Sequence, residues 1–201
     1  MREKVQEQIK QRIVKGGRGK LYVNSDFADI ALPDAVRKAL QRLTEDGFLV
    51  RSFRGIYCYP KIETELRLGV ILPSLWDIAY TIARRDQVQI APTAAEALNQ
   101  LGLSTQVPMN AVFYTTGSQR HVKVGNGKGI LFIHSSDNKL FAYHSKLMQL
   151  IVLSMREIGE GNIKDKELEK IKGFLEQVNQ KDFTHDICMA PGWIQEIIHR
   201  L

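Results

Sequence analysis

The chain is poor in cysteine and in long apolar segments. Its 201 residues include two cysteines, Cys58 and Cys188, which lie far apart and belong to no CxxC motif. This usage predicts free thiols of a reducing compartment rather than a disulfide framework. No segment approaches the roughly 18 consecutive apolar residues of a membrane span. The charged N-terminus also lacks the apolar stretch of a signal peptide. We therefore expect a cytoplasmic protein with no membrane partner.

Catalytic and metal-binding motifs are also scarce. The five histidines show no ligand spacing such as H-x3-H and adjoin no cysteine cluster. The glycine-rich stretch 125–129 departs from the Walker spacing, because no Ser or Thr follows Lys128, and it predicts a hairpin turn. Thr116-Gly117-Ser118 resembles the Gly-Ser of nucleotidyltransferases, yet Asp137 stands alone where two-metal chemistry needs a carboxylate pair. We therefore expect no catalytic residue, no metal and no cofactor, and so not an enzyme.

Positive charge is concentrated towards the N-terminus. The formal net charge is +6. Residues 1–60 hold 12 lysines and arginines against 7 acidic residues, whereas the remaining 141 residues hold 16 against 15. A basic surplus in one part of a chain is what neutralisation of DNA phosphates requires. Such a surplus also fits a simple role in solubility, so the pattern of secondary structure has to decide between the two.

The clearest pattern in the chain follows Leu32. Apolar residues recur there at i, i+3, i+4 and i+7, which predicts a helix with one buried stripe. The stripe consists of Val36, Ala39, Leu40 and Leu43. Pro33 suits the first turn of this helix, and Gly47 is suited to end it. The period then changes to that of a strand at 48–50, followed by a turn at Arg54-Gly55 and a second strand at 56–59. A helix followed by a basic two-stranded ribbon is typical of a winged helix-turn-helix.

The elements before Leu32 complete that motif. We expect a helix over residues 2–15, a short strand over 20–23 and a short second helix over 26–30. The order helix, strand, helix, helix, strand, strand is that of a winged helix, and it occupies residues 1–60.

We expect residues 61–201 to form a second, mixed α/β domain with a small sheet and a helical C-terminal third. The fold class expected for the whole chain is α+β. The strands expected in the second domain include 87–90, 111–115, 121–124 and 130–134, and its helices include 75–85, 94–101, 145–158 and 165–178.

Polar side chains on the outer face of the helix after Pro33 are the candidate DNA contacts. Arginine, lysine and glutamine hydrogen-bond base edges and phosphates. A solvated helix face would have the same composition, but the glycine stop and the basic ribbon that follow favour DNA binding. The candidates are Arg37, Lys38, Gln41 and Arg42 on the helix, with Arg51 and Arg54 on the ribbon.

Two segments resemble a known family. The segment RKALQRLTEDGFLVRSFRGIYCYP is similar to the winged-helix domain of AbiEi-type antitoxins, the regulators of type IV toxin–antitoxin pairs. The segment IAPTAAEALNQLGLSTQVPMNAVFYTTG is similar to the start of that family's second domain. The likeness covers roughly residues 1–135, and beyond them it is faint. It implies a repressor of its own operon that binds inverted repeats in double-stranded DNA and counters a nucleotidyltransferase-type toxin. It places the DNA-binding roles on the six residues named above.

Two other functions stay open at this point. The chain could be a ligand-responsive winged-helix regulator whose second domain binds a small molecule and has no toxin partner. It could also be an enzyme that uses an appended winged helix for protein contacts. A nucleotidyltransferase gene next door would favour the antitoxin, and a metabolic operon the ligand-responsive regulator. A carboxylate pair or metal cluster would support the enzyme.

Overall fold

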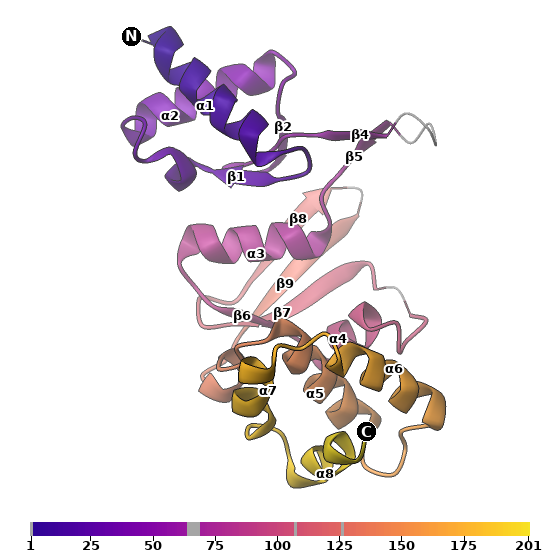
Figure 1. The fold of residues 1–201 in the computed structure, drawn as a ribbon. Coiled ribbons are helices and arrows are strands. Elements are labelled where there is room, and N and C mark those ends of the chain that lie inside the picture. Colours follow the sequence, from indigo (N-terminus) through magenta and orange to yellow (C-terminus); the bar gives the residue numbers. More distant parts are fainter. Residues whose placement is uncertain (1, 64–68, 107, 126) are drawn as a thin grey trace. The chain divides into compact units, whose positions relative to one another are not determined.

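The computed structural model describes residues 2–63, 69–106, 108–125 and 127–201 (Figure 1). Within these residues the chain forms eight α-helices, two short 3₁₀ helices and nine strands, which confirms a mixed helix-and-sheet class. The chain divides into two compact units. Unit 1 comprises residues 1–88 with 123–128, and unit 2 comprises residues 89–122 with 129–201. Asn126, within the expected hairpin turn, lies outside the described residues.

Unit 1 contains three α-helices and two small sheets. Strands β1, β2 and β3 form an antiparallel sheet in the order β1-β3-β2, while β4 and β5 form a separate hairpin. The elements are α1 (Arg2–Gly16), β1 (Leu21–Val23), the 3₁₀ helix η1 (Asn24–Phe27), α2 (Pro33–Glu45), β2 (Val50–Phe53), β3 (Ile56–Cys58), β4 (Lys61–Glu63), β5 (Gly69–Ile71) and α3 (Leu75–Asp86).

The helix expected after Leu32 is confirmed in its limits and in its buried face. Helix α2 begins at Pro33, and all four residues of the predicted stripe are buried. The chain leaves the helix through Gly47, whose φ of 71° is a conformation that glycine adopts without strain. The buried stripe packs on α1 through Ile9 and Ile13.

Two local predictions in unit 1 are wrong in their limits. The second helix, expected over 26–30, is the 3₁₀ helix η1, because the Asp26 carboxylate accepts a hydrogen bond from the Val23 amide at 2.8 Å and starts the turn earlier. The strand expected at 48–50 begins only at Val50. Before it, the Leu49 amide donates to the Leu43 carbonyl at 3.0 Å and keeps the chain at the end of α2.

Strands β1 and β3 of the three-stranded sheet are buried on both faces. Tyr22 of β1 and Tyr57 of β3 belong to the core formed with α1 and α2. Side chains alternate along a strand, so the neighbours of these tyrosines point to the opposite face. Those neighbours are Leu21, Val23, Ile56 and Cys58, and all four are buried. Helix α3 packs against β1 and β3 and covers this second face.

The position of α3 bears on the expected division of the chain at residue 60. The buried face of α3 includes Ile78, Ala79 and Ile82. Compact unit 1 accordingly continues past residue 60 to Val88. The helix ends at Gln87, a left-handed C-cap with φ of 54°. The strand expected over 87–90 therefore begins only at Ile90, because a left-handed residue cannot continue an extended strand.

Unit 2 consists mainly of five helices and a four-stranded sheet, of which the end of β8 and the first residue of β9 (residues 123–128) belong to unit 1. The sheet has the order β6-β7-β9-β8; β6 is antiparallel to β7, whereas β7 and β9 are parallel. The elements are β6 (Ile90–Pro92), α4 (Ala94–Gln100), β7 (Asn110–Thr115), β8 (Arg120–Gly125), β9 (Lys128–His134), the 3₁₀ helix η2 (Asn138–Phe141), α5 (Lys146–Ile158), α6 (Asp165–Leu175), α7 (Gln180–Ile187) and α8 (Gly192–Arg200).

Helix α5 is the central helix of unit 2. Ser145 caps it by accepting a hydrogen bond from the Met148 amide at 3.2 Å, as expected from the sequence. The middle of the helix is buried nearly all round, and α4, α6, α7 and α8 pack against it. In the described part of the chain, no helix is long and apolar enough to cross a membrane.

Candidate nucleic-acid interface

All six candidate DNA contacts are exposed and belong to unit 1. Four of them lie on α2, on the side away from the buried stripe. Arg51 lies in β2, and Arg54 lies in the turn between β2 and β3. The structure therefore presents all six to solvent, in two groups: one on a helix and one on a hairpin.

Two of the helical candidates are engaged by acidic neighbours on α2. Arg37 Nη2 lies 3.1 Å from Asp34 Oδ1, and Gln41 Nε2 donates to Glu45 Oε1 at 2.9 Å. Exposed pairs of this kind contribute about 0–1 kcal/mol, so a phosphate or a base edge can replace the acidic partner at little cost. The carboxylates nevertheless lower the net positive charge of this face.

Lys38 and Arg42 lie on the side of α2 that borders a groove with α1. The groove encloses about 750 Å³, and Lys4 of α1 lines it together with both α2 cations. Its floor is apolar and includes Val5 and Ala39. The lining thus holds three cations and one carboxylate, that of Asp34, and its surplus of positive charge is suited to contact phosphates. The basic character of α2 is thus concentrated on this side of the helix.

The hairpin that carries Arg51 and Arg54 is short and irregular. Arg51 pairs with Tyr57 of β3, and the register shifts between Arg51 and Phe53. Such a bulge increases the twist of a hairpin and redirects its end. Gly55, with φ of 72°, makes the turn beside Arg54. The exposed Arg54 side chain is therefore held at the hairpin tip.

Helix α3 supports this turn through the side chain of Arg85. Arg85 Nη1 donates to the Arg54 carbonyl at 2.6 Å, and Arg85 also pairs with Asp86 at 2.7 Å. The contact uses the backbone of Arg54 and leaves its side chain exposed. The sequence reasoning named Arg54 as a contact residue but missed Arg85 as its support. The adjacent arginines at the end of the predicted helix 75–85 were the available signal.

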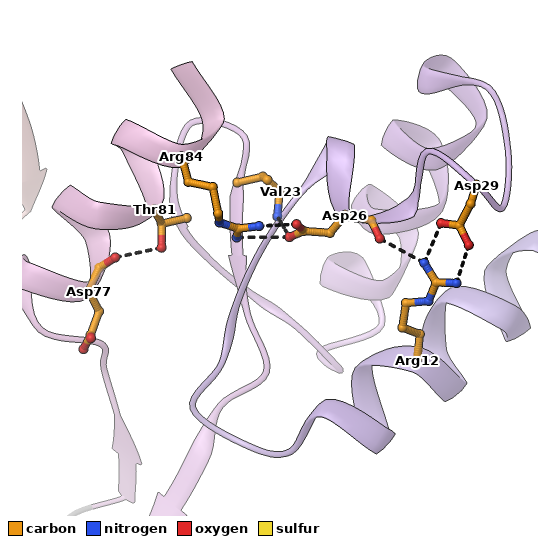
Figure 2. A network of polar contacts seen from close by, with 7 residues as sticks. All are labelled: Arg12, Val23, Asp26, Asp29, Asp77, Thr81 and Arg84. Atoms are coloured by element: carbon orange, nitrogen blue, oxygen red, sulfur yellow. Dashed lines mark hydrogen bonds and ion pairs between the residues drawn. The ribbon is translucent and has the colours of Figure 1, made fainter. Parts of the chain in front are cut away.

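A second network joins α3 to η1 and α1 (Figure 2). Arg84 of α3 forms an ion pair with Asp26, whose other oxygen lies 3.2 Å from Arg84 Nη2. Arg12 of α1 donates to the Asp26 carbonyl at 3.0 Å and makes two bonds of 2.6 Å to the Asp29 carboxylate. The hydrogen bonds from Arg12 lower the pKa of Asp29 to about 2. Together these contacts connect α1, η1 and α3.

Some of the basic residues of unit 1 contact its own aromatic rings. The Arg18 guanidinium lies 4.8 Å from the Tyr59 ring centre and donates to the Pro60 carbonyl at 2.9 Å. Lys10 lies 5.3 Å from the ring centre of Phe48. Cation–π contacts of this kind stabilise packing. Lys10 and Arg18, which belong to the N-terminal basic surplus, therefore stabilise the packing of unit 1.

Comparison with known families is informative for both units. Residues 8–183 match the family of unknown function DUF6088. The chain belongs to DUF6088. The matched range starts in α1 and ends in α7, so the family covers elements of unit 1 and of unit 2. A comparison with curated proteins finds no match.

The residues weighed for nucleotidyltransferase chemistry have local structural contacts in this DUF6088 chain. The Asp137 carboxylate accepts from the Lys139 amide at 3.0 Å and caps η2. Thr116 Oγ1 accepts from the Gln89 amide at 3.0 Å. Gly117 offers its carbonyl to His134 Nδ1 at 2.9 Å. The Asp137 contact caps η2, whereas the other two join the bend after β7 to the residue before β6 and to the end of β9. Residues 116–118 form a loop, as expected.

One cluster of potential metal ligands was missed by sequence reasoning, which looked only for ligands at short spacing. Ligand atoms of His144, His185 and Asp186 lie within 4.8 Å of one another in the described structure of unit 2. His144 precedes the cap of α5, while the other two belong to α7. Forty-one residues separate the two histidines, so no short motif could reveal them. Only the packing of α7 against α5 brings them together.

Proposed function

We propose that this member of DUF6088 is a DNA-binding transcriptional repressor and that unit 1 is a winged helix-turn-helix. The order α1, β1, η1, α2, β2, β3 matches the element order of that motif, and so does the sheet order β1-β3-β2. In this assignment α2 is the recognition helix and the β2–β3 hairpin is the wing. Helix α3 is an addition that supports the wing from behind.

The observation that carries the proposal is the separation of charge between the units. Unit 1 holds 18 lysines and arginines against 11 acidic residues, a net charge of +7. Unit 2 holds 10 against 11, a net charge of −1. The unit that exposes a polar helix face and a basic hairpin thus also holds the whole positive surplus. Electrostatic attraction to phosphates supplies most of the sequence-independent part of DNA affinity.

The geometry supports distinct roles for the candidate residues. Arg37 and Gln41 are assigned to base edges in the major groove, where they exchange their acidic neighbours on α2 for bases. Lys38 and Arg42, beside the basic groove with α1, are assigned to phosphates. Arg54 at the wing tip is assigned to phosphate or minor groove, with Arg51 nearby.

The second role we propose is that of an antitoxin in a type IV toxin–antitoxin pair. Its support is the resemblance of the segment from Ile90 to Gly117 to the second domain of AbiEi-type antitoxins. A unit with net charge of −1 is poorly suited to DNA and better suited to a protein or a ligand. Unit 2 is therefore assigned to counter a nucleotidyltransferase-type toxin encoded next to this gene.

Fluorescence anisotropy with the full chain tests the DNA-binding proposal. The probes are a labelled duplex from the region upstream of the chain's own gene and an unrelated duplex of equal length, titrated at several salt concentrations. We expect binding to both duplexes, tighter binding to the upstream one, and a strong decrease of affinity with salt. The double variant Arg51→Ala/Arg54→Ala should weaken both. Absence of salt-dependent binding would contradict the proposal.

Arg200→Ala is the matched control, because it removes one exposed arginine from unit 2. It should leave DNA affinity unchanged. Co-expression with the neighbouring toxin gene tests the antitoxin role separately. If DNA binding is present but growth is not rescued, and a small molecule releases the DNA, the chain is instead a ligand-responsive regulator.

A further inference from the structure

The two histidines and the aspartate between α5 and α7 form a compact polar cluster outside the proposed DNA interface. The rings of His144 and His185 are stacked, with their centres 3.6 Å apart and their planes 5° from parallel. His144 is exposed, His185 is half-buried, and Asp186 is fully buried. The two imidazoles therefore lie between solvent and a buried negative charge.

Asp186 is held firmly in this position. Its Oδ1 accepts from the His144 amide at 2.9 Å, and its Oδ2 accepts from the Ser145 amide at 2.8 Å. A buried carboxylate is stable when hydrogen bonds satisfy it. These two bonds also tie α7 to the start of α5. The carboxylate thus has a structural role, which by itself leaves the stacked histidines unexplained.

The contact between Asp186 and His185 selects one form of that imidazole. His185 Nδ1 lies 2.8 Å from Asp186 Oδ1. A carboxylate oxygen only accepts hydrogen bonds, so Nδ1 carries the proton and Nε2 of the neutral ring carries the lone pair. A carboxylate that orients the far side of a histidine in this way is the usual support of a metal-ligating imidazole.

We propose that His144 and His185 bind a divalent transition-metal ion of the Zn²⁺ class, with Asp186 as the carboxylate that orients His185. Imidazole nitrogens are preferred ligands of such ions. One potential ligand atom each of His144, His185 and Asp186 lies within 4.8 Å of the others. Two nitrogens bound to one zinc lie about 3.3 Å apart, given Zn–N bonds of about 2.0–2.1 Å, so the histidine rings have to adjust when the ion binds. Water completes the coordination. This inference does not depend on the proposed DNA or toxin partners.

The stacked arrangement has to open when the ion binds. A metal lies in the plane of each imidazole that ligates it, and two parallel rings cannot share one ion in both planes. His144 is the ring that can turn, because it is exposed and precedes the cap of α5. His185 stays in place through its bond to Asp186. The ion then links the start of α5 to α7 and should raise the melting temperature of the full chain.

Isothermal titration of Zn²⁺ into the full chain, free of metal and of any polyhistidine tag, tests this site. We expect one ion per chain. His144→Ala and His185→Ala should each weaken binding at least tenfold, and Asp186→Asn should weaken it about 10- to 100-fold. His199→Ala is the matched control, since that ring lies on α8 and contacts the Gln195 carbonyl; it should leave the affinity unchanged.

The result for His144→Ala decides the proposal. The side chain is exposed, so its removal should leave the fold intact, and circular dichroism checks this directly. Asp186→Asn retains an oxygen acceptor but could lower stability, so its result counts only for folded protein. With Cu²⁺ as the probe, electron paramagnetic resonance should show coupling to two imidazole nitrogens, reduced to one in His144→Ala. No saturable Zn²⁺ binding, or equal affinity in the wild type and His144→Ala, would overturn the site.

Discussion

Arg84 and Asp26, which are 58 residues apart, form an ion pair that connects α3 to η1. The Asp26 side chain is 21% exposed and also accepts the Val23 amide at the end of β1. One carboxylate therefore both accepts from the amide of Val23, the N-cap residue of η1, and anchors α3. Because α3 covers one face of the sheet and supports the hairpin turn, the pair bears on the whole of unit 1.

We expect Arg84→Ala to lower the free energy of unfolding of unit 1 by about 1 kcal/mol, since the pair is only partly shielded from solvent. Asp26→Ala should cost about 2 kcal/mol, because it also removes the hydrogen bond to the amide of Val23, the N-cap residue of η1. Urea unfolding in a Trp193→Phe background measures this. Trp76 of α3 is then the only tryptophan and reports on unit 1.

Arg37→Ala, at an i,i+3 pair with Asp34 in unit 1 in which the side chains are 64% and 83% exposed, serves as the control for a surface ion pair. It should change stability by less than about 0.5 kcal/mol. In a double-mutant cycle, Arg84→Ala should have little further effect once Asp26 is alanine. Fully additive losses would show that the two residues do not stabilise each other.

The helix assigned to DNA recognition gives a second prediction. Arg37→Ala and Gln41→Ala should each cost about 1–3 kcal/mol of operator binding, because each removes a side chain suited to a base edge. Asp34→Asn should maintain or increase affinity, since it releases Arg37 from its acidic neighbour. Gel-shift titration of folded variants measures both effects. Unchanged affinity in the first two variants would show that α2 does not contact bases in the major groove of DNA.

The wing gives a third prediction, which distinguishes Arg54, assigned to contact DNA, from Arg85, which supports the turn. Arg54→Ala should weaken specific and non-specific DNA binding alike and reduce the salt slope by about 1, the effect of one lost phosphate contact. It leaves the Arg54 carbonyl in place for Arg85. Arg85→Ala should instead loosen the turn. Anisotropy at several salt concentrations measures these effects; a loss confined to one DNA sequence would make Arg54 a base reader.

The pKa of Asp29 predicts how stability changes in acid. Bonding to Arg12 lowers this pKa from its usual 3.8 to about 2 in the folded chain. A lowered folded pKa means that the stabilisation is complete above about pH 4 and is lost as pH falls from there towards 2. Asp29→Asn should be less stable than the wild type at neutral pH, with the difference shrinking below about pH 4 and vanishing only below about pH 2. A difference that persists unchanged through this window would contradict the assignment, and NMR titration of the carboxyl reads the pKa directly.

The two faces of the sheet give a prediction about fragments. A fragment of residues 1–88 should fold and bind DNA, whereas 1–60 should be much less stable. Removing α3 would expose Val23 and Ile56, both fully buried in the chain, and each such side chain contributes about 1.5–3 kcal/mol when buried. Circular dichroism and urea unfolding compare the two fragments. Equal stability would show that α3 is not part of the folded core.

Much of unit 1 could be predicted because its pattern is local. Helix α2 has apolar residues at helical spacing between Pro33 and Gly47, and each of these signals depends on neighbours within one or two turns. The exposure of Arg37 and Arg54 follows from the same pattern, since they fall outside the buried stripe or in a turn. The start of β2 was misplaced because Leu49 is bonded to the end of α2, a contact that alternation cannot show.

Contacts between residues far apart in the chain could not be predicted from the sequence. Periodicity predicts that α3 has an apolar face, but not that this face covers β1 and β3 and so moves the limit of unit 1 to Val88. The parallel pairing of β7 with β9 and the stacking of His144 on His185 are of the same kind. The sequence by itself determined the local elements and the excess of charge, because both depend on near neighbours or on counting. Which faces meet was decided by the tertiary structure, because burial of apolar surface is not directional and many pairings satisfy it equally.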